Sequence, residues 1–389
     1  MSTIKVQNIQ HTGSSTNAIA LASDGTCTAN ITNNLSNRNK VINGSAIVSQ
    51  RGTTIHGTSA TYTAIDRFST RTGSSYDFDV EVSQSTDTPD GFSKSLKISP
   101  RATSTPSASQ NGAIQTKLEG QDVQDFAFGT SSAKSITLSF YAKSGSAGAG
   151  TYSIELHFVN ASGSIFQQTR AFTVTTSWQR FSFTFEGNGA ATSNAVVNNN
   201  SDAFRIIWHL ASGPDDKASA ITTWTVLSSM KTITGMDNFM SSTSNEFYLT
   251  GVQLETGSFS SDFQFRSFPE ELALCQRYFY MHASGAEAAS SNKAPIATGA
   301  MYNSGNWNGV INFPVKMRTS PSLYKVEGTD YFIIWGDGGN DSCNSVLLDS
   351  SSPQSGTANL TGGLAQTSGT SHWATTYNSA TRLGFQAEL

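Results

Sequence analysis

Apolar and polar residues alternate along much of the middle of the chain. In one run Ile136, Leu138 and Phe140 are separated by single polar residues. The same alternation recurs in three further segments, residues 152–158, 181–185 and 204–210. Because successive side chains of a β-strand point to opposite faces of a sheet, each run places one apolar row on one face. The pattern therefore predicts strands that bury one face and leave the other polar.

Clusters of Gly, Ser and Asn separate these runs, for example at residues 145–150 and 198–201. No helical periodicity lies between the runs, which favours antiparallel pairing over alternating strands and helices. We therefore expect residues 41–266 to form a two-sheet β-sandwich of the jelly-roll type. Trp208 falls on the apolar phase of its strand, so its side chain is expected in the core of this sandwich.

Three further segments flank the predicted sandwich. Residues 1–40 are short strand-like pieces with too few apolar residues for a core, so we expect an extended attachment or oligomerisation segment. Residues 267–284 are predicted to be a linking helix, because Ser267 is a suitable N-cap and Glu270 completes a capping box. Residues 285–389 are predicted to be a second β domain, at the tip of the molecule. The predicted fold class is all-β.

The composition narrows the functional classes. Charged residues are 13% of the 389 residues and aromatic residues are 10%, so apolar surface suffices for real cores although charge is sparse. The net charge is −4 without a basic stripe, which argues against nucleic-acid binding. Neither a signal peptide nor an apolar run long enough to enter a membrane is visible, so release by cell lysis is expected, and a cytosolic assembly protein fits equally.

Recognisable catalytic chemistry is absent from the sequence. No nucleotide-binding, zinc-protease or serine-hydrolase motif occurs, so we expect no enzyme activity, no metal and no cofactor. His157 and His209 fall on the polar phase of their strands and are expected at the solvated surface. A calcium site at Asp337, Asn340 and Asp341 is less favoured than a plain polar turn. Solvated turns or metal ligands are favoured over catalytic carboxylates for the neighbouring acids Asp77/Asp79, Asp122/Asp125 and Asp215/Asp216.

Aromatic residues near the loops of residues 300–380 are the candidate binding residues. Trp307 and Trp373 stand among Asn, Gly and Ser, outside any alternating run, and Tyr331 and Trp335 accompany similar loops. An exposed indole stacks on the apolar face of a sugar ring, while neighbouring polar groups bond its hydroxyls. We therefore predict glycan binding by these four residues. For Trp307 and Trp373 an indole folded back as a loop anchor is an equal alternative.

Several short stretches occur in a specific order along the chain: residues 2–6 (STIKV), 37–44 (NRNKVING), 49–52 (SQRG), 62–68 (YTAIDRF), 119–123 (EGQDV), 247–255 (FYLTGVQLE) and 271–278 (ELALCQRY). Together they resemble tail-fibre and related virion proteins of phages, especially marine and cyanobacterial ones. Beyond residue 285 the resemblance is confined to residues 313–318 (FPVKMR) and 387–389 (AEL). The resemblance implies a carbohydrate-binding-module-like sandwich in a virion component that is usually trimeric, with an N-terminal attachment segment and a distal binding tip.

Three functions follow from these observations. The first is a tail-fibre subunit of the virion: residues 1–40 bind other tail or baseplate proteins, the sandwich forms a shaft, and the C-terminal domain binds host surface glycan. The second is a purely structural fibre, adaptor or capsid appendage. The third is a polysaccharide depolymerase. Residues 1–40 must bury their apolar side chains between chains, so an oligomer is expected. The family resemblance implies that this oligomer is a homotrimer.

Overall fold

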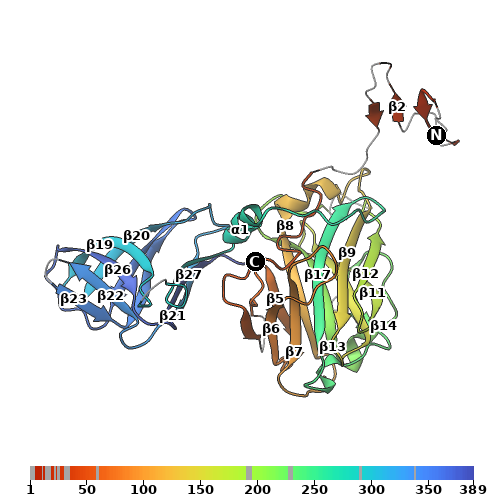
Figure 1. Ribbon diagram of the computed structural model, residues 1–389. Helices are drawn as coiled ribbons and strands as arrows, with labels where there is room; N and C mark the ends of the chain where they lie inside the picture. Colours follow the sequence, from red (N-terminus) through yellow and green to blue (C-terminus); the bar gives the residue numbers. More distant parts are fainter. Residues whose placement is uncertain are drawn as a thin grey trace.

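The computed structural model describes residues 5–10, 12–13, 19–21, 23, 27–29, 36–57, 61–189, 195–226, 231–288, 291–336 and 339–389. The described chain is built almost entirely of strands, so the all-β prediction is confirmed. Figure 1 shows three parts: a large sandwich, a smaller C-terminal unit beside it, and an N-terminal segment that projects away from the sandwich. No helix among the described residues is long and apolar enough to cross a membrane.

The sandwich consists of two six-stranded sheets whose strands all pair antiparallel. Sheet 1 contains, in spatial order, β15 (Thr225–Val226), β11 (Ile165–Val174), β10 (Gly150–Val159), β13 (Asp202–Ser212), β8 (Asn111–Glu119) and β5 (Phe68–Gly73). Sheet 2 contains, in spatial order, β12 (Gln179–Phe185), β9 (Ile136–Ser144), β17 (Phe247–Thr256), β7 (Ser95–Pro100), β6 (Val80–Ser85) and β4 (Thr54–Gly57). The described residues of this part also include a two-stranded parallel sheet, β14 (Lys217–Ala218) with β16 (Thr232–Ile233). Short 3-10 helices span Gly120–Phe126, Pro214–Asp216 and Phe239–Ser241.

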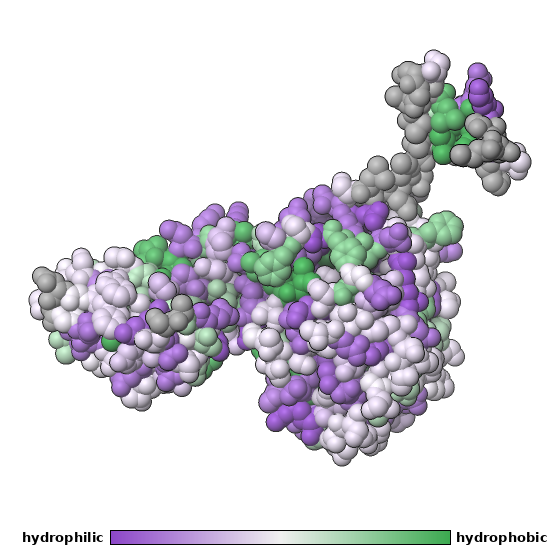
Figure 2. Space-filling view, in the orientation of Figure 1, coloured by the Kyte–Doolittle hydropathy of each residue, from purple (hydrophilic) through white to green (hydrophobic). Residues whose placement is uncertain are grey.

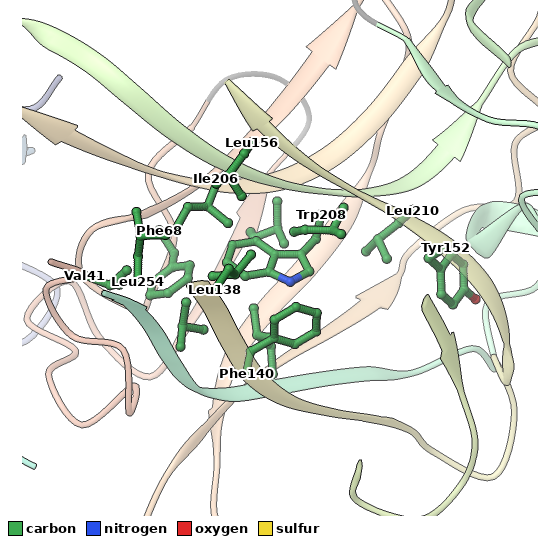
Figure 3. Packing of buried hydrophobic residues seen from close by; sticks show 14 of the residues in the cluster. Val41, Phe68, Leu138, Phe140, Tyr152, Leu156, Ile206, Trp208, Leu210 and Leu254 are labelled. Carbon is green, nitrogen blue, oxygen red and sulfur yellow. The ribbon is translucent and has the colours of Figure 1, made fainter. Parts of the chain in front are cut away.

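The core of the sandwich lies between the two sheets. The apolar rows predicted from the alternation point inward from both sheets, and Trp208 is fully buried among them, as predicted. Its ring lies 5.6 Å from the ring of Phe140 on sheet 2 and 6.2 Å from that of Phe68 on sheet 1, between centroids. Figure 3 shows this packing from close by. Aromatic and branched side chains thus fill the space that the two apolar faces enclose.

The N-terminal segment has a small sheet of its own. Its strands β1 (Asn8–Ile9), β2 (Ile19–Leu21) and β3 (Cys27–Ala29) pair antiparallel. Val6, Ile9 and Leu21 are 43–51% exposed, because the sandwich does not cover them. The described residues of this segment therefore bury little apolar surface within one chain.

One α-helix follows the sandwich, and it is shorter than predicted. Helix α1 spans Phe268–Gln276, and the Glu270 carboxylate accepts a hydrogen bond from the backbone N–H of Ser267 at 2.9 Å, as the capping box predicts. Residues 279–284, which the sequence assigned to the helical link, instead form strand β18 (Phe279–Ser284) of the C-terminal unit. Phe279 continues the apolar spacing of the helix, but it is buried as the first residue of that strand.

The C-terminal unit contains two antiparallel sheets around a second core. The three-stranded sheet is, in spatial order, β18, β27 (Arg382–Gln386) and β21 (Ser322–Val326). The seven-stranded sheet is, in spatial order, β23 (Gly339–Cys343), β22 (Phe332–Gly336), β26 (Ser371–Thr376), β19 (Pro295–Asn303), β20 (Asn306–Asn312), β25 (Ser355–Thr361) and β24 (Ser345–Ser351). The unit is therefore closed by pairing between β18, at its beginning, and β27, near residue 389.

Buried charges join the C-terminal unit to the sandwich. The Glu388 carboxylate pairs with Arg51, at 2.9 Å, and with Arg67 of the sandwich. The Tyr62 hydroxyl donates a hydrogen bond to the carbonyl oxygen of Leu389 at 2.7 Å. All three partners on the sandwich come from the stretches that carry the virion-protein resemblance, so those stretches meet at one junction rather than at a binding surface.

Candidate functional site

Two of the four predicted binding residues form an exposed aromatic pair on the C-terminal unit. Trp335 on β22 and Trp373 on β26 are direct cross-strand partners, which places both side chains on the same face of the sheet. Their rings are stacked, with centroids 5.4 Å apart and planes 18° apart. The Trp335 indole N–H donates to Thr375 Oγ1 at 3.2 Å, which fixes the orientation of that ring. Trp373 is 50% exposed, so the pair presents a flat indole face to solvent.

A cation and a polar pocket lie beside this indole pair. The Lys293 ammonium is 4.3 Å from the centre of the Trp335 ring and 5.8 Å from that of Tyr377, which is 43% exposed. Lys293 also lines a pocket of about 440 Å³, together with His282 and Glu287. Burial lowers the pKa of His282, so its imidazole is neutral at neutral pH. The arrangement offers a stacking surface next to hydrogen-bonding groups, which is the chemistry that a sugar ring requires.

The prediction of an exposed loop tryptophan at position 307 is wrong. Trp307 lies in strand β20 and is completely buried in the second core, where its indole N–H donates to the carbonyl oxygen of His372 at 3.2 Å. Two glycines make room for the ring: an added Cβ at Gly309 would lie 2.3 Å from it and one at Gly299 would lie 2.8 Å from it. The Gly- and Asn-rich residues around Trp307 suggested a loop, but they lie in paired strands that surround the buried indole.

Tyr331 also has a packing role. Its side chain is partly buried against the second core. Its carbonyl oxygen accepts hydrogen bonds from the Tyr377 backbone N–H at 2.8 Å and the Thr381 hydroxyl at 2.9 Å. The structure therefore brings together Trp335 and Trp373 of the predicted set. Sequence reasoning missed Lys293 and Tyr377, because nothing in their local context distinguishes them from other surface residues.

The possible calcium loop is only partly within the described residues. Asp337 lies outside them, and Asn340 is exposed on β23. The Asp341 carboxylate accepts hydrogen bonds from the Ala365 backbone N–H at 2.8 Å and from Gln366 Nε2 at 3.1 Å, so it holds the neighbouring loop. Within the described part of the chain no group of three or more His, Cys, Asp and Glu residues is placed to hold a metal ion.

The neighbouring acids considered for sugar hydrolysis make structural contacts. Asp79 pairs with Arg101 at 2.9 Å, and Asp125 pairs with Lys40 at 3.0 Å. The Asp216 carboxylate accepts a hydrogen bond from Asn111 Nδ2 at 2.7 Å. One member of each candidate pair therefore holds two segments of the sandwich together.

The prediction that His157 and His209 are solvated is also wrong. Both are buried on the face of sheet 1 that points away from the core. The fully buried Glu155 carboxylate lies between them, with Oε1 3.2 Å from His157 Nδ1 and Oε2 2.7 Å from His209 Nε2. Burial would raise the pKa of Glu155, but these two hydrogen bonds and the imidazole charges outweigh it and lower the pKa to about 2.

The segment that follows β13 explains why this polar face is buried. Gln167 Nε2 on β11 donates to the carbonyl oxygen of Lys231 at 2.8 Å, and the Ile221 backbone N–H donates to Thr169 Oγ1 at 2.9 Å. The described residues 213–226 and 231–235 thus return along the outer face of β11 and cover part of it. A period of two tells which side chains share a face, but it does not tell whether another segment covers that face.

The fold defines an all-β protein built on a two-sheet β-sandwich. No protein-family model and no curated protein matches the chain. Among solved structures, the enzymatically active domain of tailspike protein 4 from bacteriophage CBA120 is 12% identical, with a TM-score of 0.28, over 56% of this chain and 21% of that one.

Carbohydrate-binding modules are also among the similar solved structures. A family 11 module from Clostridium thermocellum is 11% identical, with a TM-score of 0.27, over 50% of this chain and 90% of that one. A xylan-binding CBM22-1 domain from Paenibacillus barcinonensis is 11% identical, with a TM-score of 0.28, over 53% of this chain and 95% of that one. Similarities with these TM-scores do not identify a ligand for this chain. Any ligand must therefore be inferred from the residues of the chain itself.

Proposed function

We propose that this chain is a non-catalytic structural protein of a phage particle, a tail-fibre subunit that attaches the particle to host surface glycan. The observation that carries the proposal is the exposed Trp335–Trp373 pair beside the pocket lined by Lys293 and Glu287. The family resemblance of residues 1–280 supports a place in the virion. The proposed host contact is therefore the C-terminal unit, which Figure 1 shows at the opposite end of the molecule from the N-terminal segment.

The chemistry of the pair suits a sugar ring. The half-exposed face of Trp373 stacks on the apolar face of a pyranose, while Lys293, whose ammonium is 4.3 Å from the centre of the Trp335 ring, bonds a hydroxyl group at its edge. One such contact contributes on the order of 1 kcal/mol beyond the buried area, so a single chain binds weakly. Several copies on one rigid fibre raise the avidity by linking the binding events.

The N-terminal segment is proposed to attach the subunit to other tail or baseplate proteins and to assemble it as a homotrimer. The exposed side chains of Val6, Ile9 and Leu21 support this, because the described part of the chain provides no surface that covers them. Light scattering of the full-length protein at micromolar concentration is expected to give three times the mass of one chain. A stable monomer would overturn this part of the proposal.

Glycan binding is tested with the full-length protein and polysaccharide from the envelope of the host. Trp373→Ala is expected to weaken the binding in affinity electrophoresis at least several-fold, whereas Tyr302→Ala is expected to leave it unchanged. Tyr302 is the matched control, because it is 74% exposed on β19 of the same unit but makes no ring contact with the indole pair. Equal binding by both variants and the unchanged protein would sink the proposal.

Simple measurements distinguish the proposed glycan-binding function from two alternative functions. A purely structural fibre or capsid appendage predicts no binding of host polysaccharide by any form of the protein. A depolymerase predicts release of reducing sugar from that polysaccharide by the pure protein, abolished by a single Asp→Asn substitution. We expect binding without release.

A further inference from the structure

An apolar surface lies at helix α1, away from the indole pair. Three large side chains are exposed there: Phe265 by 58%, Phe268 by 53% and Leu274 by 36%. They belong to α1 and to the strap that leads into it from β17. Figure 2 shows hydrophobic residues at the position of α1. Single exposed apolar residues are ordinary, but several at one place indicate a contact surface.

A groove, which we call the α1 groove, runs beside these side chains and has a volume of about 590 Å³. Its apolar lining comes from Phe265, Ala273 and Leu274, and Asn37 lines it at the foot of the N-terminal segment. A cavity of roughly 150 Å³ holds a benzene ring, so the α1 groove has room for several apolar side chains.

The apolar lining of the α1 groove is held in position. The Phe265 ring lies 5.0 Å from the Phe92 ring and 4.9 Å from the Phe263 ring, between centroids. The Phe92 ring lies 5.3 Å from that of Tyr141 on β9, which ties this cluster to sheet 2. Leu274 is fixed on α1. Because these groups are ordered before anything binds, little conformational entropy is lost when the groove is filled.

The N-terminal segment carries a second apolar surface. Ile9 and Ile19 are direct cross-strand partners, and Leu21 lies two residues beyond Ile19, so the three side chains share one face of the small sheet. Ile9 is 51% exposed and Leu21 is 43% exposed. The strands are only two or three residues long, so this sheet needs another surface to pack against.

The two apolar surfaces do not meet within one chain. Figure 1 shows the N-terminal segment pointing away from the sandwich, whereas the α1 groove lies against it. Both surfaces are buried at once when the segment of one copy enters the groove of another. Burial of apolar area on both sides is the main favourable contribution to such an association.

Charge agrees with this pairing. Lys5 is the only charged residue among the described residues of the N-terminal segment. At the rim of the α1 groove Arg266 is already paired with Glu271 at 3.3 Å. The exposed Glu270 carboxylate accepts hydrogen bonds from Ser267, within its own capping box, and makes no ion pair with a described residue. Glu270 therefore leaves a negative charge at the rim that suits the Lys5 ammonium.

We propose that the N-terminal segment of one copy of this chain binds in the α1 groove of the next copy. Ile9 and Leu21 enter the groove, and Lys5 lies beside Glu270. The two surfaces differ, so the contact is heterologous, and such contacts form a ring when the rotation between copies closes. This inference rests on the homotrimer proposed above and names the surface that holds it together.

Light scattering of the full-length protein at micromolar concentration tests the contact from both sides. Leu274→Glu places a charge in the groove and Leu21→Glu places one on the N-terminal face, and each is expected to reduce the mass from three chains to one. Phe259→Glu is the matched control, because Phe259 is 78% exposed in the same strap but does not line the groove. It is expected to remain a trimer. Circular dichroism of all three variants is expected to match that of the unchanged protein.

Cross-linking shows which chain provides the segment. Leu21→Cys and Leu274→Cys are combined with Cys27→Ser, because Cys275 and Cys343 are buried and Cys27 lies in the segment itself. A short bis-maleimide is expected to join different chains into dimers and trimers on a denaturing gel. Cross-links confined to single chains, or none while the trimer persists, would overturn the proposal.

Failure of this contact is distinguishable from failure of the homotrimer. A trimer that persists in both Leu21→Glu and Leu274→Glu would leave the homotrimer standing and refute the contact, because the copies would then be joined elsewhere. A monomer in the unchanged protein would refute the homotrimer and this inference together.

Discussion

At the scale of single residues, two tryptophans with similar sequence contexts have opposite roles. Trp307→Ala is expected to destabilise the C-terminal unit by about 3–5 kcal/mol, because it removes a fully buried indole and leaves a cavity. Trp373→Ala is expected to change the melting temperature little, because half of that side chain is already in water. Thermal unfolding of both variants measures the contrast. A large loss of stability in Trp373→Ala would contradict the assignment of its indole to a binding surface.

Glu155 makes the stability of the sandwich depend on pH in the acid range. Its pKa is about 2 in the folded protein and 4.5 ordinarily, so folding is favoured while the carboxylate is charged. The contribution is fully present above pH 4.5 and is lost as the pH falls towards 2; by linkage it amounts to about 3 kcal/mol. Denaturant unfolding between pH 2 and 5 is expected to show this slope, and Glu155→Gln to reduce it. An identical slope in the variant would show that other carboxylates are responsible.

At the scale of elements, glycines inside strands are explained by the side chains that lie over them. An added Cβ at Gly309 of β20 would lie 2.3 Å from the Trp307 ring, a distance that forces the indole or the strand to move. Gly309→Ala is therefore expected to destabilise the C-terminal unit by about 1–3 kcal/mol. Gly305→Ala is the control, because its nearest neighbour would be 3.8 Å away. Chemical unfolding followed by tryptophan fluorescence distinguishes the two.

Elements also show which local signals are reliable. The capping box at Ser267 and Glu270 predicted the start of α1 correctly, because it depends on hydrogen bonds between side chains and backbone N–H groups within four residues. The end of α1 was placed too late, because Phe279 suits either a helix stripe or a buried strand. Phe279 belongs to a strand because β18 pairs with β27, which lies about a hundred residues away. No local sequence pattern predicts that pairing.

At the scale of the whole molecule, the junction around Glu388 holds the C-terminal unit against the sandwich. Glu388→Ala leaves Arg51 and Arg67 buried without this carboxylate, and it is expected to cost about 3–5 kcal/mol. Small-angle scattering is expected to show a broader distribution of shapes in the variant, and limited proteolysis to cut faster near residues 277–279. Lys325→Ala is the control, since its pair with Glu327 is partly exposed within one unit. Unchanged scattering in Glu388→Ala would mean that packing alone fixes the joint.

Sequence alone determined the all-β class, the presence of a β-sandwich, and the buried position of Trp208. These depend on the alternation of neighbouring side chains, which a strand converts directly into two faces. Their loop-like context placed Trp335 and Trp373 among the candidate binding residues, but it could not show that they stack, because cross-strand register is not encoded locally.

Only the tertiary structure decided which polar faces are solvated and which aromatic residues are exposed. His157, His209 and Glu155 lie on a polar face by periodicity, yet the described residues 213–226 and 231–235 return along that face and help to bury it. Trp307 is buried because the second core encloses its ring and the carbonyl oxygen of His372, 65 residues away, accepts its indole N–H. The physical reason is the same in both cases: exposure is a property of what packs against a residue, and the packing partners come from segments far apart along the chain.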